Sequence, residues 1–245
     1  MWYAKPKYGY NIDSTECVEN VLEINGMLNN AGYTLEAQAG LLGCVYGESG
    51  MNPWRWQNDE VVYTRGYGLF QFTPARGRYT NNGYVPGYFI DCENLSGFAP
   101  NNSVSEVVSG ALPSDGYCQV NVVITDFLGK WTTGCWRDYW DSSEYPTLYA
   151  KSRSILNTYG SNGKLTQGQF ATITDIGDAT LAFLACYEGP AVPDYNNRLN
   201  YANTMYSYLS GVTPPPPTPD PVKPPIKPTV TGRKLPFWMM CRKVF

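Results

Sequence analysis

The chain has 245 residues, 43% of them apolar and 15% aromatic, which is enough for one well-buried core and a small appendage. Residues 212–245 hold six basic side chains and one acid, a net charge of +5, so the remainder carries −8 of an overall charge of −3. An acidic body argues against nucleic acid as the main partner.

Histidine is absent from the sequence, and this absence excludes several enzyme classes. Ser-His-Asp and Cys-His nucleophiles require an imidazole, and so do many zinc sites of peptidases and amidases. Cleavage of a glycosidic bond requires only carboxylates, so this chemistry remains available. We expect no metal and no organic cofactor.

The seven cysteines include no CxxC pair, so neither a redox motif nor a zinc ribbon is expected. Two interpretations stay open: free thiols used as small apolar core residues, or one or two disulfides among Cys92, Cys118 and Cys135. The sequence also shows neither the apolar stretch of a secretory signal at its start nor an apolar run long enough for a membrane-spanning helix.

Residues 1–10 are aromatic and irregular, and we interpret them as an N-terminal arm. A first helix is expected to begin at Asp13, because Asp13 and Glu16 resemble a capping box, and to end before Gly32. A second helix is expected after Thr34, a good N-cap residue.

This second helix should end near Glu48, because Gly50 favours a left-handed cap and Pro53 cannot continue the helix. Residues 54–118 are rich in turn signals and predict a small subdomain of strands or loops, with residues 92–117 as a surface excursion without helix. Helical spacing returns in four later segments, at residues 120–131, 145–159, 175–187 and 196–209.

The composition changes abruptly after Gly211. Residues 214–228 hold nine prolines, so residues 212–229 are expected to form an extended, semi-rigid linker. Residues 230–245 follow as a basic and apolar C-terminal tail. The fold class predicted from these patterns is mainly α, a helical domain over residues 11–211 with a small β or loop subdomain.

The segment Gly47 to Pro53 (GESGMNP) places the carboxylate of Glu48 at a helix end beside a tight turn. The negative end of the helix dipole and the aromatic neighbours Trp54 and Trp56 would both disfavour ionised Glu48. A carboxyl group that keeps its proton is what a general acid requires. The ordinary alternative is a solvated glutamate on the last helical turn.

Two further motifs have ordinary alternatives of their own. In residues 66–74 (GYGLFQFTP), glycines permit close approach of the backbone to a ligand, and Gln71 offers a donor and an acceptor to a sugar. The same residues also suit a plain glycine-rich hairpin with a buried aromatic. Residues 185–190 (ACYEGP) end a helix, and a simple cap followed by a proline explains them equally well.

Taken together and in order, ESGMNP, GYGLFQ and YEGP resemble the phage tail lysozyme family, which is similar to goose-type lysozymes and soluble lytic transglycosylases. The resemblance covers residues 11–209. It implies a lysozyme-like fold with Glu48 as the catalytic acid, Gln71 lining the cleft and Tyr187 near the acid. Phe70, within the second motif, is also expected to bind substrate.

The identity of a second catalytic group stays open. Glu188 stands where the related transglycosylases have a sugar-binding asparagine, so it could contact substrate, act as a second carboxylate or cap a helix. Asp59 and Glu60 are the other candidate carboxylates, although acids on loops are commonly only solvated. Attack by water and formation of an anhydro-sugar cannot be separated from the sequence. Three aromatic rings that flank the motifs are expected to stack on sugars in the cleft: Trp54, Trp56 and Tyr67.

The resemblance implies cleavage of the β-1,4 bond between N-acetylmuramic acid and N-acetylglucosamine in peptidoglycan, by a virion component during genome entry; an extracellular enzyme is the alternative. We expect residues 230–245 to dock on another tail protein, with insertion into a membrane surface as the rival. Two other functions compete: a non-catalytic glycan-binding or tail-tip structural protein, and a cell-wall peptidase, against which the absence of histidine argues.

Overall fold

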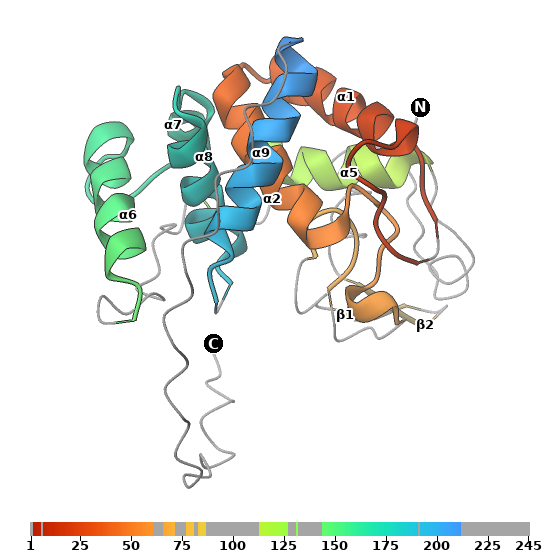
Figure 1. Cartoon of the computed structure of the whole chain (residues 1–245). Coiled ribbons are helices and arrows are strands. Elements are labelled where there is room, and N and C mark those ends of the chain that lie inside the picture. Colours follow the sequence, from red (N-terminus) through yellow and green to blue (C-terminus); the bar gives the residue numbers. More distant parts are fainter. Residues whose placement is uncertain are drawn as a thin grey trace, which may run out of the picture.

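The fold of the chain comes from a computed structural model (Figure 1). The structure describes residues 2–5, 7–60, 66–71, 77–80, 83–86, 113–126, 131, 144–190 and 192–211. Within these ranges the fold is mainly helical, which confirms the predicted class. None of the described helices is long and apolar enough to cross a membrane. The predicted linker and tail, residues 212–245, lie outside the described residues.

The first helix, α1, spans Thr15–Asn30 and begins later than predicted. Ser14 is its N-cap, and its Oγ accepts a hydrogen bond of 3.2 Å from the amide of Cys17. The carboxylate of Asp13 accepts instead from the hydroxyl of Tyr208, at 2.7 Å. The expected capping role of Asp13 is therefore wrong, because the serine one position later takes the N-cap conformation and leaves Asp13 to the closing helix.

The second helix, α2, spans Leu35–Ser49 and agrees with the prediction at both ends. The hydroxyl of Thr34 accepts from the amide of Ala37 at 3.1 Å, and Gly50 ends the helix in the left-handed conformation with a φ of 59°. Residues 37–45 are buried without interruption. Such burial on all sides identifies α2 as the central helix of the domain, with the other helices packed around it (Figure 1).

Few of the residues between 61 and 143 are described. A short 3-10 turn, η1, spans Gln57–Asp59, and β1 (Gly77–Thr80) pairs with β2 (Gly83–Pro86) in an antiparallel hairpin. Helix α5 spans Pro113–Ile124, so the expectation that residues 92–117 contain no helix is wrong at its end. Proline suits the first position of a helix, where its missing N–H costs no hydrogen bond.

Helices predominate in the described part of the C-terminal half of the domain. Helices α6 (Pro146–Tyr159) and α9 (Tyr195–Ser210) confirm two predicted segments, and α8 (Ile176–Phe183) confirms the third together with η2 (Leu184–Glu188), a π-helical continuation. A short helix, α7 (Gln167–Ala171), was not predicted, since five residues carry too little periodicity to be recognised.

Two glycines of α2 allow its neighbours to approach closely. A Cβ on Gly40 would lie 2.6 Å from the Cβ of Ala179 on α8, and a Cβ on Gly43 would lie 2.5 Å from the backbone of Ala202 on α9. Gly40 is therefore covered by α8 and Gly43 by α9. This contact fixes the position of α9 relative to the end of α2.

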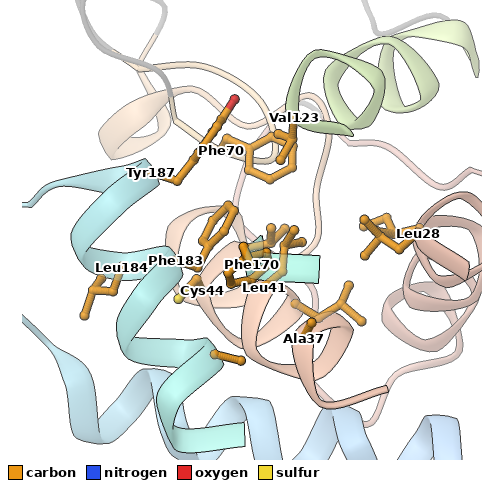
Figure 2. Packing of buried hydrophobic residues seen from close by; sticks show 14 of the residues in the cluster. Leu28, Ala37, Leu41, Cys44, Phe70, Val123, Phe170, Phe183, Leu184 and Tyr187 are labelled. Carbon is orange, nitrogen blue, oxygen red and sulfur yellow. The ribbon is translucent and has the colours of Figure 1, made fainter. Parts of the chain in front are cut away.

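Aromatic rings of α7, α8 and η2 pack together with Phe70 and Trp131. Phe183 stacks on Tyr187 with ring centroids 5.0 Å apart, and Trp131 packs against Phe170 at 4.9 Å. Figure 2 shows Phe70, Phe170, Phe183 and Tyr187 gathered beside Leu41 of α2. These ring contacts pack η2 against the core and so fix the position of the residues at its end.

Three of the cysteines settle one open question in part. Cys17, Cys44 and Cys186 are free and buried, as the interpretation as small apolar core residues predicts. The proposed disulfide partners Cys92 and Cys135 lie outside the described residues, as does the side chain of Cys118.

Replacement of Gly43 by alanine tests the close approach of α2 and α9. The added methyl would overlap the backbone of α9, so we expect the free energy of unfolding to fall by about 1–3 kcal/mol. Thermal and chemical unfolding would measure the loss. Gly26→Ala, at an exposed position of α1, is the control: nothing lies within 4 Å of its added Cβ, so alanine should be neutral or stabilise by up to about 1 kcal/mol. Equal effects of the two changes would contradict the packing described above.

Candidate active site

Glu48 lies in the last turn of α2, one residue before the helix ends. Its side chain is 23% exposed, so solvent reaches part of it. Gly50 and the following turn lead the chain away from the helix axis immediately afterwards. The position matches the sequence prediction of one carboxylate at a helix C-terminus beside a tight turn.

Glu48 faces a buried arginine that the sequence analysis did not assign to the site. Nη2 of Arg198, from α9, donates a hydrogen bond to Oε1 of Glu48, and Nη1 donates to the backbone carbonyl of Cys44. The side chain of Arg198 is only 9% exposed. The guanidinium therefore holds the carboxyl group of Glu48 from the side of α9.

Glu188 completes the cluster from a third segment. Its Oε2 lies 3.9 Å from the same Nη2 of Arg198, and its side chain is 5% exposed. Glu188 is the last residue of the π-helix η2, and Gly189 then caps this helix in the left-handed conformation with a φ of 61°. π-Helical turns are rare and are found frequently at functional sites. Here the turn carries Glu188 to the guanidinium, so its role as a mere helix cap is not supported.

The charges of the cluster depend strongly on one another. Burial alone would lower the pKa of Arg198, but interaction with the nearby acids, Glu188 first, outweighs this effect and raises the pKa above its ordinary value. Burial raises the pKa of Cys44 well above that of a free thiol, and the charge of Glu188 adds to this effect. Cys44 therefore contributes a neutral thiol to the cluster.

Gly47 provides the seat of the guanidinium. A Cβ at this position would lie 2.0 Å from Nη1 of Arg198 and 2.4 Å from its Cζ. The arginine therefore lies flat on the last turn of α2, directly beside Glu48. This explains the glycine that precedes the glutamate in the motif, because any side chain there would displace the arginine.

Gln71 supports the fold of its own loop. Its Nε2 donates to the carbonyls of Arg55 and Gly68, at 2.8 Å each, and its backbone adopts a positive φ of 46°. The side chain is partly exposed. Gln71 thus joins the second motif to the turn that follows α2, and a contact with sugar stays a prediction.

The aromatic rings proposed for the cleft are in fact core rings. Trp56 and Tyr67 are 1% and 0% exposed and pack edge to face with centroids 4.6 Å apart, and Trp54 is 7% exposed. Phe70 and Tyr187 are buried as well. A ring stacks on a sugar only with an exposed face, so the assignment of these rings to sugar stacking is corrected. Sequence position beside a motif did not reveal which way each ring points.

The loop carboxylates are placed differently from one another. Asp59 accepts a hydrogen bond of 2.6 Å from the backbone amide of Tyr8 and lies 3.4 Å from Nε of Arg55. It therefore ties the N-terminal arm to the turn after α2. Glu60, the next residue, is exposed. These placements do not identify either residue as the second catalytic carboxylate, so that role stays a prediction.

Asn52, in the first motif, holds the N-terminal arm against the end of α2. Its Nδ2 donates to the carbonyls of Lys5 and Tyr8 at 2.9 and 2.8 Å, and its Oδ1 accepts from the amide of Trp54 at 3.1 Å. The residue is fully buried. The N-terminal arm, which was predicted only as irregular, thus packs against the turn that follows Glu48.

Arg198 is the residue of the cluster whose role the sequence analysis missed. One signal was present: it is the only charged residue in α9, which is otherwise uncharged along its whole length. A lone arginine on a helix that packs into the core needs a buried counter-charge.

Among the described residues, no group of three or more cysteines, aspartates or glutamates is arranged to hold a metal ion.

Asn52→Ala tests the attachment of the arm. It would leave the carbonyls of Lys5 and Tyr8 without their donor, so we expect the free energy of unfolding to fall by about 1–3 kcal/mol. Hydrogen exchange should rise selectively at residues 7–10. Asn30→Ala, at an exposed residue, is the matched control and should change neither quantity. Unchanged exchange in Asn52→Ala would show that other contacts suffice to hold the arm.

The chain is similar to phage proteins over part of its length. The family model described as phage tail lysozyme matches residues 19–88, a range that holds Glu48, Asn52 and Gln71. Morphogenesis protein 1 of Bacillus phage B103 is 40% identical over 76 residues, which are 31% of this chain and 20% of that protein. The chain thus matches only a fifth of the length of this relative. Over residues 19–88 the predicted resemblance is confirmed: the segment that carries Glu48 matches the phage tail lysozyme family.

Proposed function

We propose that the chain is a glycosidase that degrades peptidoglycan by cleaving the β-1,4 bond between N-acetylmuramic acid and N-acetylglucosamine. The observation that carries the proposal is the position of Glu48: a partly exposed carboxyl group at the end of α2, within the family-matched segment and hydrogen-bonded to a buried arginine. Glu48 would protonate the sugar oxygen that leaves when the bond breaks.

The geometry suits an acid that must be held in place. The hydrogen bond from Arg198 engages Oε1 of Glu48, so Oε2 is left to approach the substrate. The base of the site consists of α2, α9 and η2, which are regular helical elements rather than loops. A group fixed on packed helices loses little orientation freedom when the substrate binds, which favours catalysis.

The biological setting follows from the relatives. A phage tail lysozyme family model and a phage morphogenesis protein both point to a bacteriophage protein, and we propose a virion component in the tail that opens the cell wall locally. Peptidoglycan would be the main partner, and no cofactor is invoked. A free extracellular enzyme is the alternative location.

A non-catalytic protein that keeps the fold is the rival function. Burial of the proposed stacking rings favours this rival to a degree, because it removes the expected sugar platforms from the site. Retention of a solvent-accessible glutamate with a dedicated arginine argues against it. A buried charge is costly to maintain, and a role of Glu48 in turnover would account for this cost.

Glu48→Gln is the direct test of the proposal. The amide keeps the shape of the side chain and an acceptor for Arg198 but cannot donate a proton to the leaving oxygen, so we expect digestion of purified peptidoglycan to fall about a hundredfold or more. Soluble muropeptides would be measured by mass spectrometry. Reducing ends would indicate attack by water, and 1,6-anhydro ends would indicate a transglycosylase.

Glu36→Gln is the matched control, because Glu36 lies in the first turn of the same helix and is also partly exposed. It should digest peptidoglycan like the unaltered protein. If the unaltered protein binds several wall types but releases nothing from any of them, the binding function replaces the catalytic one.

The composition of residues 230–245 suggests a docking tail. We propose that this tail binds another tail protein and that residues 212–229 are the leash, a linker between the tail and the catalytic domain. Deletion of residues 230–245 should therefore leave digestion of isolated peptidoglycan unchanged, because the tail would act in attachment. Initial digestion rates of the full and shortened chains would be compared at equal concentration. A large loss of activity on isolated wall would contradict the leash proposal, and increased binding of the full chain to lipid vesicles would favour the membrane alternative.

A further inference from the structure

We propose that the rings of Tyr46 and Tyr201, with the adjoining hollow at residues 11–14, bind an N-acetylglucosamine unit of the glycan strand. This inference rests on the proposed function and deepens it, because it names a place where the strand is held beyond the bond at Glu48. It supplies the aromatic contact with sugar that the buried rings of the motifs do not provide.

Tyr46 and Tyr201 form a pair of partly exposed rings at the end of α2. Tyr46 lies two residues before Glu48, Tyr201 lies three residues after Arg198 on α9, and Gly47 beside Tyr46 is exposed. The ring centroids are 4.7 Å apart, and the ring planes make an angle of 65°. In such an edge-to-face pair each ring keeps a face that the other does not cover, so a partly exposed pair can offer a face to a sugar.

A hollow of about 510 Å³ adjoins the ring pair and is lined by Tyr46 and residues 11–14. This volume falls within the range of small-molecule sites, roughly 300–1,000 Å³. Most side chains of residues 11–14 carry a hydrogen-bonding group, which suits a ligand covered with hydroxyl and amide groups. These groups are the amide of Asn11, the carboxylate of Asp13 and the hydroxyl of Ser14.

Hydrogen bonds hold the walls of the hollow in place. The hydroxyl of Tyr208 donates to Oδ1 of Asp13 at 2.7 Å and lies 3.3 Å from the carbonyl oxygen of Ile12. The hydroxyl of Tyr46 donates to the carbonyl of Tyr10 at 3.2 Å. The walls are therefore formed before a sugar binds, which reduces the loss of side-chain freedom on binding.

Helix α9, which packs along α2 (Figure 1), connects this subsite to the candidate acid. Arg198, Tyr201 and Tyr208 are spaced by three and seven residues, so they lie on neighbouring positions of one face of α9. The first contacts Glu48, the second contacts the ring of Tyr46 and the third contacts the wall of the hollow. Ten residues of helix span about 15 Å, so a glycan strand that lies along this face reaches both the acid and the hollow.

The charge of the lining favours a neutral sugar. Asp13 is the one charged residue among the described residues that line the hollow. This acid would repel a phosphate-rich wall polymer, and an apolar ligand would leave the polar groups of the lining without partners. Of the two sugars in peptidoglycan, N-acetylglucosamine is neutral, whereas N-acetylmuramic acid carries a lactyl group that ends in a carboxylate or in the stem peptide. The hollow therefore fits N-acetylglucosamine better.

Binding of a neutral probe tests the subsite without turnover. The probe is the tetramer of N-acetylglucosamine, and the parent protein is the full chain with Glu48→Gln, followed by NMR titration. Tyr201→Leu in this parent removes a ring face, so we expect the dissociation constant to rise about three- to tenfold. Tyr201→Phe keeps the ring and should bind the probe like the parent.

Two further variants control for position and for folding. Tyr206→Leu changes a partly exposed tyrosine on another face of α9 and should leave the dissociation constant unchanged. Asn11→Ala changes an exposed residue of the hollow and leaves the ring pair intact, so it tests the subsite even if Tyr201→Leu does not fold. We expect a rise of about threefold for Asn11→Ala, because one hydrogen bond to the sugar is lost.

Three results would overturn the proposal. The first is no measurable binding of the probe by the parent, and the second is equal binding by the parent, Tyr201→Leu and Asn11→Ala. The third is tighter binding of a glycerol phosphate polymer than of the neutral probe, which would contradict the choice of ligand.

Digestion of peptidoglycan separates this proposal from the proposed function. In the otherwise unaltered chain, Tyr201→Leu should raise KM with little change in kcat, because the ring contributes binding rather than proton transfer. Digestion with an unchanged KM in Tyr201→Leu would refute the subsite and retain the function. A protein that binds the probe through Tyr201 but digests no wall would refute the function and retain the subsite.

Discussion

The contact of the Arg198 guanidinium with the last turn of α2 is the interaction on which the site depends. A charged side chain that is 9% exposed requires partners, and here they are two glutamates and the backbone carbonyl of Cys44. The guanidinium fits only because Gly47 has no side chain, and α9 reaches α2 only because Gly43 leaves room for its backbone. The glycines of α2 and the ionisable side chains at its end therefore depend on one another.

This arrangement explains why the protein needs its distant closing helices. Glu48 belongs to a segment that matches the phage tail lysozyme family over residues 19–88, but both groups that surround it lie beyond that range. The π-helical turn η2 brings in Glu188, and the aromatic stack of Phe183 and Tyr187 holds this turn in place. The N-terminal arm reinforces the opposite side through Asn52. A short motif thus depends on segments that lie as many as 150 residues away.

Sequence patterns predicted the helices well and the directions of side chains poorly. The ends of α2 were recognised because Thr34 and Gly50 are strong local cap signals. The first helix was placed too early because Asp13 and Ser14 are both good N-cap residues, and only the contact of Asp13 with Tyr208 separates them. Trp54, Trp56 and Tyr67 were expected in the cleft from their position in the chain, yet burial places them in the core. Proximity in sequence does not determine which face of a turn a ring occupies.

The amino-acid sequence by itself determined that Glu48 ends a helix and that the motifs around it resemble phage tail lysozymes, because caps and motif spacing are properties of adjacent residues. Only the tertiary structure decided the charge environment of Glu48. Arg198 and Glu188 lie 150 and 140 residues further along the chain, and their convergence depends on the close packing of α2, α8 and α9. Coulombic interactions depend on distance in space, so no local pattern could show that a single guanidinium lies between the two acids.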